Sequence, residues 1–334
     1  MQVVLPVAGF GSRMRPHTWS KPKPLIALAG KTVLDYVLEQ FSTLPEIDDI
    51  EYVFIVGPNQ LEQIQAHMRQ AHPGKRVHYV VQEKMRGQSD ALYLARDYLS
   101  GPMLMTFTDT VMETDLSAIC NEDCDGRAWV RPVADPRRFG VAALDEEGWI
   151  TRLVEKPQDV TNNLAVVGFY YFKQGEALMA AIEEQFRRDV TLKGEFFLAD
   201  AINIMLERGA RMRTQQVDVW LDAGLPEALL ETNRYLLEHG HDNSAESAAR
   251  LPNVAIVPPV FIAPSAHVEF SVIGPYVSVG EEGDLRHVVV RNSILEDGAM
   301  VHNMLLENSL LGRDVHVEGQ MMHLNLGDQS WATS

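Results

Sequence analysis

A short segment near the amino end carries residue types that bind phosphate groups. It runs from Leu5 to Pro16 with the sequence LPVAGFGSRMRP, directly after an apolar run expected to form a strand. Two glycines, Gly9 and Gly11, let the backbone pass close to a ligand with its N–H groups pointing outward. Met14 stands where a dinucleotide fingerprint has its third glycine, and no Gly-Lys-Ser/Thr follows as in a P-loop. The segment therefore predicts a phosphate-binding turn of neither of these two kinds.

Positive charge gathers in the same part of the chain. The first 34 residues contain basic side chains and no Asp or Glu, whereas the whole chain has 46 acidic and 29 basic residues and a formal net charge of −17. A run of basic residues is usually a solvated surface, but these alternate with prolines and glycines that fix a loop. We therefore expect an anion-binding site. Its candidate bases are Arg13, Arg15, Lys21, Lys23 and Lys31.

The elements that must position these groups alternate along the first 240 residues. Short apolar runs predict buried strands, and segments with apolar residues at three- and four-residue spacing predict amphipathic helices. Strands alternating with helices favour an α/β fold with a mostly parallel, Rossmann-like sheet flanked by helices, where ligands bind at the carboxyl ends of the strands. The predicted strands are Val3–Leu5, Tyr52–Val56, Val77–Val81 and Met103–Phe107, and the predicted helices are Val33–Phe41 and Gln60–Gln70.

The pattern changes after residue 240. Small polar residues from 241 to 252 predict a linker, and beyond it apolar residues recur every five or six positions with Gly, Ser or Pro between them. Such a period is typical of a parallel β-helix, and an antiparallel β domain with turns at Gly274-Pro275 and Asp297-Gly298 is the alternative. We expect a first domain over 1–240, a short β-helix over 253–326 and a tail over 327–334. The recurring positions are Ile262, Val268, Ile273, Val279, Leu285, Leu311 and Val317.

The composition excludes several classes of protein. At 334 residues the chain is long enough for about two domains. Hydrophobic residues make up 46% and charged residues 22%, which is the balance of a globular protein and not of a disordered or collagen-like one. The acidic charge opposes nucleic acid and anionic membranes, and we expect neither a signal peptide nor a membrane span. Two cysteines, Cys120 and Cys124, predict a reduced, cytoplasmic protein.

Several motifs, in one order along the chain, resemble the sugar-phosphate nucleotidyltransferases. That family opens with a Gly-x-Gly-Thr-Arg turn followed by a Lys-Pro pair, and here Gly9 to Arg13 precede Lys23-Pro24. The chain looks most like the glucose-1-phosphate thymidylyl- or uridylyltransferases that end in a left-handed β-helix of hexapeptide repeats. The further matching segments are Gln82–Ala91, Thr108-Asp109, Phe139–Val141, Glu155–Pro157, Val167–Phe169, Gly194–Asp200 and Trp220–Gly224.

The resemblance implies a metal-assisted transfer of a nucleotidyl group. A sugar phosphate would attack the α-phosphorus of a nucleoside triphosphate in line, so positioning and electrostatic stabilisation would supply most of the catalysis. Asp109 and Asp222 are the implied ligands of a hard cation, which we expect to be Mg²⁺, although an Asp at a strand end can instead cap a helix. Arg13 would clamp the departing pyrophosphate, Lys23 would neutralise charge near the reacting phosphates, and Lys156 would hold the sugar phosphate.

The same resemblance implies which residues bind the substrates. Gln82 would contact the edge of the nucleobase, because an amide offers both a donor and an acceptor, and Gly87 would let the backbone lie close to the base. Glu155 would accept hydrogen bonds from sugar hydroxyls, although a surface ion pair with its neighbour is the plainer interpretation. Gly140 and Gly168 would leave room for the sugar ring. The glycine turn would contribute Ala8, Gly9, Gly11 and Ser12.

Four positions depart from the family pattern. Ser12 replaces the usual Thr and keeps the hydroxyl, whereas Thr108 stands directly before Asp109 where Gly is common. Ala27 and Ala223 replace a frequent Pro and a frequent Thr. None of the four removes a charge that the chemistry needs.

The function expected from these residues is the joining of a hexose-1-phosphate, above all glucose-1-phosphate, to dTTP or UTP with release of pyrophosphate. One alternative is an enzyme like mannose-1-phosphate guanylyltransferase. Others are a non-catalytic homologue that binds a nucleotide sugar and regulates a partner, and a bifunctional enzyme whose β-helix also transfers an acyl group. The presence of every charged residue that the chemistry needs favours catalysis. The expected partners are the two substrates and further copies of the chain in a homo-oligomer.

Overall fold

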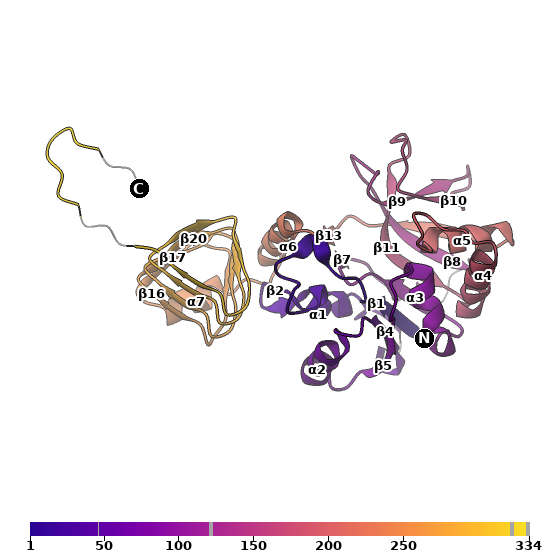
Figure 1. Cartoon of the computed structure of the whole chain (residues 1–334), viewed down its shortest axis with the longest axis horizontal. Helices are drawn as coiled ribbons and strands as arrows, with labels where there is room; N and C mark the ends of the chain where they lie inside the picture. Colours follow the sequence, from indigo (N-terminus) through magenta and orange to yellow (C-terminus); the bar gives the residue numbers. More distant parts are fainter. Residues whose placement is uncertain (46, 120–122, 321–323, 332–334) are drawn as a thin grey trace. The chain divides into compact units, whose positions relative to one another are not determined.

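The structure, a computed structural model, describes residues 1–45, 47–119, 123–320 and 324–331 (Figure 1). The chain folds into two compact units, one made of Met1–Ile26 with Thr32–Ala228 and the other of Ala27–Lys31 with Leu229–Ser334. The boundaries expected at residues 240 and 252 stay a prediction. Of the two cysteines, Cys120 lies outside the described residues and Cys124 is buried.

The first unit is built on a sheet whose centre is parallel. Its central strands are β1 (Gln2–Pro6), β4 (Glu51–Val56), β5 (Arg76–Val81) and β6 (Met103–Thr106). They pair in parallel in the order β6-β1-β4-β5, and Val4 of β1 lies opposite both Val53 and Met105. Most residues of β1, β4 and β6 are buried, because the sheet is covered on both faces, and this explains why the runs are apolar without alternation. The four predicted strands are confirmed.

Antiparallel strands extend this sheet beyond β6. They are β8 (Gly126–Pro132), β9 (Gly140–Leu144), β10 (Ile150–Glu155) and β11 (Leu164–Phe172), while β12 (Met212–Gln216) pairs in parallel with β8. Strand β11 pairs with β6, β8 and β9, and Tyr170 lies opposite Met105. The predicted α/β class is confirmed, and the sheet is more mixed than the alternation of strands and helices indicated.

Helices cover the sheet and complete its core. They are α1 (Val33–Glu39), α2 (Leu61–Ala71), α3 (Gln88–Leu94), α4 (Gly175–Arg187) and α5 (Leu198–Glu207), with 3-10 turns η3 (Ile47–Asp49) and η4 (Arg96–Tyr98). The first two coincide with the predicted helices. One apolar cluster joins Leu92 of α3, Ile182 of α4 and Ile202 of α5 to Val53 and Met105 of the sheet. The sheet is therefore held rigidly beneath the turns that follow its strands.

A small antiparallel ribbon joins two distant segments of the first unit. Strand β7 (Thr110–Met112) follows β6, and β13 (Trp220–Asp222) comes late in the sequence. Their pairing places Asp222 opposite Thr110. The N–H of Ala223 also donates to the carbonyl oxygen of Asp109 at 3.0 Å. The ribbon therefore brings the turn that follows β6 next to the Leu-Asp-Ala-Gly turn.

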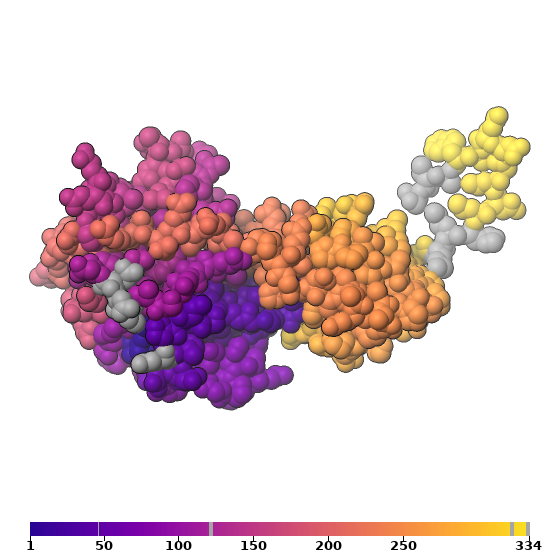
Figure 2. Space-filling view, turned by 180° about the vertical axis from the view of Figure 1, so that it is seen from behind, coloured from indigo at the N-terminus to yellow at the C-terminus, as the bar shows by residue number. Residues whose placement is uncertain are grey.

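The second unit contains a three-sided β-helix of parallel strands (Figure 1), and Figure 2 shows its coils as one closely packed body. Val260 pairs with Val277, which pairs with Ser293, so a coil takes 17 or 16 residues. The described pairs between these coils are parallel, which confirms the β-helix and makes the antiparallel alternative wrong. The first side holds β14 (Val254–Ile256), β17 (Ser271–Ile273), β20 (Val289–Arg291) and β23 (Leu305–Glu307). The second holds β15 (Val260–Ile262), β18 (Val277–Val279), β21 (Ser293–Leu295) and β24 (Leu310–Leu311). The third holds β16 (His267–Glu269), β19 (Asp284–Arg286), β22 (Met300–His302) and β25 (His316–Glu318).

The recurring apolar positions form the core of these coils. Ile262, Val268, Ile273, Val279 and Leu285 are each at most 4% exposed. The two last recurring positions are half-buried and pack against the same core; they are Leu311 and Val317. The five- or six-residue period therefore arises because each side of a coil directs one of these side chains inward.

Part of the expected linker is ordered as a helix. Helices α6 (Pro226–Glu238) and α7 (Ser244–Arg250) precede the first coil. The hydroxyl of Ser244 accepts a hydrogen bond from the N–H of Val260, and the side-chain oxygen of Asn243 accepts one from Ile262, both at 2.9 Å. Arg250 donates to the carbonyl oxygen of Ala263 at 3.0 Å. The segment thus satisfies backbone groups at the start of the β-helix.

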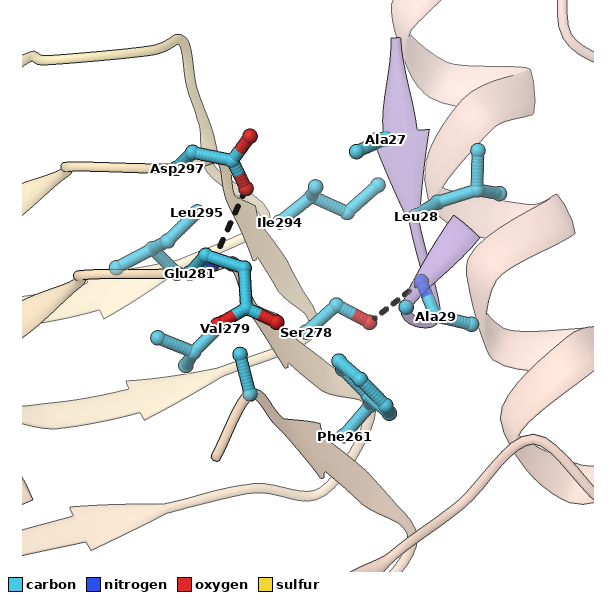
Figure 3. A pocket seen from close by; sticks show the side chains of 13 residues that line it. Ala27, Leu28, Ala29, Phe261, Ser278, Val279, Glu281, Ile294, Leu295 and Asp297 are labelled. Carbon is cyan, nitrogen blue, oxygen red and sulfur yellow. Dashed lines mark hydrogen bonds between the residues drawn. The ribbon is translucent and has the colours of Figure 1, made fainter. Parts of the chain in front are cut away.

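Residues 27–31, far from the coils in sequence, belong to this second unit and lie against them (Figure 3). They include β2 (Ala27–Leu28) and the start of β3 (Lys31–Thr32). The N–H of Ala29 donates to Ser278 Oγ at 3.0 Å and to Asn233 Oδ1 at 3.1 Å. A small pocket between this segment and the coils is lined by apolar residues such as Phe261 and Ile294.

Gly274, at a corner of the β-helix, has no room for a side chain. Its φ is +109°, and a Cβ there would lie 1.9 Å from the carbonyl oxygen of Val257. Gly274→Ala is therefore expected to lower the free energy of unfolding by about 2–5 kcal/mol, through backbone strain and overpacking. Urea and thermal unfolding would measure the loss. Gly240→Ala is the matched control, because Gly240 has φ +96° and no described atom within 4 Å of its Cβ position. Equal losses in the two variants would contradict the steric explanation.

Candidate active site

The glycine turn after β1 is held open by hydrogen bonds from its neighbours. The N–H groups of Val7 and Ala8 donate to the carbonyl oxygen of Ile55 at 2.7 and 3.0 Å, and the side-chain amide of Gln60 donates to the carbonyl oxygen of Gly9 at 3.1 Å. Gly9 is exposed, and no described atom lies within 4 Å of its Cβ position. The turn therefore presents its backbone to solvent at the carboxyl end of a central strand.

The residues after the turn anchor it to the core. Gly11 has φ +58°, and its carbonyl oxygen accepts a hydrogen bond from the Thr18 hydroxyl at 2.8 Å. The 3-10 turn η1 (Ser12–Met14) then buries Met14 completely and leaves Ser12 and Arg13 exposed. Met14, which excluded the dinucleotide fingerprint, thus acts as an apolar anchor that positions the arginine beside it.

Two carboxylates and a lysine meet at a single point in the first unit. Lys23 lies in the 3-10 turn η2 (Lys23–Leu25), and its Nζ forms an ion pair with Asp109 Oδ2. A Cβ on Gly224 would lie 2.6 Å from Asp222 Oδ1, 3.2 Å from Lys23 Nζ and 3.4 Å from Asp109 Oδ2. Gly224 also donates its N–H to Asp222 Oδ1 at 2.6 Å. The glycine leaves the space around which the three charged groups gather.

The electrostatics of Asp222 fit a site that takes a cation. Burial raises the pKa of Asp222, and the charge of Asp109 raises it further, whereas the Gly224 N–H, Lys23 and Arg13 lower it. Two carboxylates that repel each other in a partly buried site gain from a divalent cation between them. The charge of Arg13 favours the ionised form of the same carboxylate, so Arg13 adds to the field around Lys23, Asp109 and Asp222.

A second cluster surrounds Glu155. Burial raises the pKa of this carboxyl, Lys156 lowers it and Asp200 raises it. Lys156 Nζ lies 3.6 Å from Glu155 Oε1 and 4.6 Å from the centre of the Phe197 ring. The pairing of β9 with β10 sets Gly140 opposite Glu155, and a Cβ on Gly140 would lie 3.1 Å from Glu155 Oε2. Gly140 therefore makes room for this carboxylate.

The backbone at Lys156 has an uncommon conformation beside the Glu155 carboxylate. Lys156 has φ +47°, a backbone conformation that residues other than glycine rarely adopt. The Glu155 side chain is 19% exposed and that of Lys156 is 47% exposed. An ordinary surface pair needs neither a half-buried carboxylate nor a left-handed backbone, so the plainer interpretation fits these observations less well.

Gln82 and Gly87 lie together at the start of α3. Gln82 is 3% exposed, and its Nε2 donates to Asp90 Oδ2 at 3.1 Å and to the carbonyl oxygen of Gly87 at 3.4 Å. A nucleobase would therefore have to bind Gln82 Oε1 or displace the hydrogen bonds of Gln82 Nε2. Gly87 has φ +110°, and a Cβ there would lie 2.5 Å from the carbonyl oxygen of Phe196. Close packing against Phe196 therefore requires this glycine, whatever it does for a base.

Gly168 is explained in the same way. It has φ +85°, and a Cβ there would lie 2.4 Å from Cδ2 of Phe107. The N–H of Phe107 donates to the carbonyl oxygen of Gly168 at 3.1 Å, which fixes the turn before Asp109. Thr108 is buried in this turn, and Asp109 still reaches Lys23. The change from Gly to Thr at this position does not prevent the contact.

Two groups of residues were missed by sequence reasoning. Asp200 lies in the matching segment Gly194–Asp200, yet only the fold reveals that its charge raises the pKa of Glu155. Asp35 of α1 accepts hydrogen bonds from His67 and His72, which lie in α2 and directly after it. No spacing in the sequence indicates that Asp35 and the two histidines meet. Burial would raise the pKa of Asp35, but hydrogen bonds from His67, Thr32 and His72 hold it well below its usual range.

The fold and the charged cluster together define a class of protein. An exposed glycine turn, two bases and two carboxylates meet beyond the carboxyl ends of adjacent parallel strands, where α/β proteins bind phosphorylated ligands. Residues 2–239 match the family model described as nucleotidyl transferase. The chain belongs to this family, and the resemblance to sugar-phosphate nucleotidyltransferases is confirmed.

Relatives along the whole length support this assignment. The chain is 30% identical to the low-salt glycan biosynthesis nucleotidyltransferase Agl11 of Haloferax volcanii, over 95% of this chain and 94% of that protein. It is 30% identical to a glucose-1-phosphate thymidylyltransferase of Streptomyces antibioticus, over 99% of this chain and 98% of that protein. A crystal structure of UDP-glucose pyrophosphorylase complexed with UDP-glucose shares the fold, with a TM-score of 0.60 and 20% identity over 71% of this chain and 98% of that one.

None of the helices that the structure describes has the length and apolar character needed to span a bilayer.

Proposed function

We propose that the protein joins glucose-1-phosphate to dTTP or UTP and releases pyrophosphate. The observation that carries this proposal is the convergence of Lys23, Asp109 and Asp222 around Gly224, with Arg13 acting on the same carboxylate. The names of relatives that match nearly the whole chain support the sugar phosphate and the pyrimidine nucleotide. An oxygen of the sugar phosphate would form the new bond to the α-phosphorus, and the bond to pyrophosphate would break.

We propose that a divalent cation, Mg²⁺, binds between Asp109 and Asp222. Both donors are carboxylate oxygens, which suit a hard cation that also binds substrate phosphates. The gap left by Gly224 and the mutual repulsion of the two carboxylates are the observations that support the fit. When bound, the cation would neutralise charge that develops on the phosphates.

The basic residues would act on the triphosphate. Arg13 is exposed beside the glycine turn, so its planar guanidinium can pair with two oxygens of the departing pyrophosphate. Lys23 is 13% exposed and would neutralise charge close to the α-phosphate. Backbone N–H groups of Gly9, Gly11 and Ser12 would complete the phosphate contacts.

The cluster at Glu155 would hold the sugar phosphate. Lys156 would bind its phosphate, and Glu155 would accept hydrogen bonds from the sugar hydroxyls, with Gly140 giving space. Gln82 would contact the nucleobase through Oε1, because its amide nitrogen already donates to Asp90. Self-association of the chain stays a prediction that sedimentation velocity would test.

A matrix of substrates tests the proposed function. Four nucleoside triphosphates would be combined with glucose-, galactose- and mannose-1-phosphate, and pyrophosphate release followed with and without Mg²⁺. We expect the highest kcat/KM with a pyrimidine triphosphate and glucose-1-phosphate, and loss of turnover without metal. Preference between dTTP and UTP rests on one methyl group, worth about 1–3 kcal/mol. Activity confined to GTP and mannose-1-phosphate would overturn the substrate assignment, and binding of a nucleotide sugar without turnover would overturn catalysis.

A further inference from the structure

Two histidines and an aspartate converge in the first unit, in a cluster that the proposed function does not use. Asp35 lies in α1, His67 in α2, and His72 directly follows α2. Nε2 of each histidine lies 2.7 Å from the same atom, Asp35 Oδ1. The three side chains are 14%, 18% and 18% exposed, so they are shielded but reachable from solvent.

The local fold orients each of these groups. Thr32 caps α1, and its N–H and hydroxyl donate to Asp35 Oδ2 at 2.8 and 2.7 Å, which directs Oδ1 toward the histidines. The N–H of His72 donates to the carbonyl oxygen of Met68 at 3.0 Å and closes the last turn of α2. The two imidazole rings then meet edge to face, with centres 6.0 Å apart.

We propose that Asp35, His67 and His72 bind a divalent transition-metal ion, such as Zn²⁺, that ties α1 to the end of α2. Two imidazole nitrogens and a carboxylate oxygen are ligands that Zn²⁺ and its first-row neighbours favour. All three ligand atoms lie within 4.8 Å of one another. Ligand atoms on a tetrahedral zinc ion lie roughly 3.3 Å apart, so small side-chain rotations would admit the ion.

The contact from Thr32 strengthens this assignment. Ligating carboxylates in metal sites are usually fixed by a hydrogen bond to their second oxygen, as Thr32 does for Asp35. The partial exposure of the cluster leaves a path for entry and a fourth position for water. Because this site offers imidazole nitrogen and the Asp109–Asp222 pair offers oxygen alone, the two sites should select different metals.

The test is titration of the tag-free, EDTA-treated full chain with Co²⁺ and Zn²⁺. We expect one Co²⁺ ion to give the intense visible bands of a tetrahedral site, and Zn²⁺ to abolish them. His67→Asn and His72→Asn should each remove the bands, while His78→Asn should keep them, since His78 pairs with Glu51 outside the cluster. Asp222→Asn should also keep the bands, which separates this site from the proposed catalytic one.

A second measurement keeps the proposal decidable if a variant folds poorly. A ligand that binds the folded state raises its Tm, so Zn²⁺ should raise the Tm of the wild-type chain but not that of a folded histidine variant. Thr32→Val should weaken Zn²⁺ binding by about 10–100-fold. A hydrogen-bonded trio without affinity for metal would give neither bands nor a Tm shift and would overturn the proposal. So would bands that persist in both histidine variants.

Discussion

Asp222→Asn is expected to lower turnover by about 1000-fold while the protein stays folded. Asparagine keeps the size of the side chain and can still accept the N–H of Gly224, which contacts Asp222 Oδ1 at 2.6 Å. It cannot supply the negative charge that would hold the proposed cation between this position and Asp109. A loss of this size corresponds to about 4 kcal/mol of transition-state stabilisation. Pyrophosphate release at saturating substrates and Mg²⁺ would measure it.

The stability of this variant should not fall with its activity. The charge of Asp109 and burial both raise the pKa of Asp222, so the ionised pair is unfavourable in the protein without its cation. Removing one charge relieves that repulsion, and the Tm should stay unchanged or rise. Asp218→Asn is the control, because Asp218 is exposed and lies just before β13. Turnover within tenfold of wild type in Asp222→Asn would contradict the metal assignment.

Lys23→Met is expected to lower kcat/KM by about 100–1000-fold. Methionine has a similar length and no charge, so the variant removes the cation that pairs with Asp109 while filling much of the same space. The reacting phosphates would then meet two carboxylates without the compensating ammonium group. Steady-state kinetics with glucose-1-phosphate and the preferred triphosphate would measure the loss. Lys173→Met, which alters an exposed lysine of the same unit, serves as the control.

The pH dependence of the same variant provides a second readout. Asp222 must be ionised to act, and its pKa lies above the ordinary value, so kcat/KM should fall as the pH drops through this raised pKa. Lys23 lowers the pKa of Asp222, and its removal should therefore move the acid limb to higher pH. A profile that keeps the wild-type shape and is merely scaled down would show that Lys23 does not act on this carboxylate.

The elements of the fold that could be predicted are those whose burial leaves a regular pattern. The central strands are apolar throughout because both faces of the sheet are covered, and the inward positions of the β-helix recur with every side of the coil. The antiparallel strands could not be predicted with the same ease. Strand β11 is as apolar as a parallel strand, with only Leu164 half-buried, and nothing in its sequence indicates its direction.

Some features of the candidate site could likewise be predicted from the sequence, and others could not. The charged residues near the glycine turn could be picked out because they are adjacent in sequence and lie in a recognisable motif. The nearness of Asp109 to Asp222 depends on the pairing of β7 with β13, which no local pattern reveals. The substrate roles of Gly87 and Gly168 stay a prediction, whereas the structure shows that each glycine avoids a clash within the protein, with Phe196 and Phe107. Such clashes arise between distant segments, so the sequence alone cannot indicate them.

Each coil of the β-helix pairs only with the coils next to it, and this limits how the protein can change in length. One coil takes 17 or 16 residues, as the partners of Val277 show. A one-residue insertion within a strand would turn the inward side chains that follow it in that strand toward water. Evolution can therefore lengthen or shorten the β-helix by whole coils, or add loops at its corners. Neither change requires a substitution in the first unit.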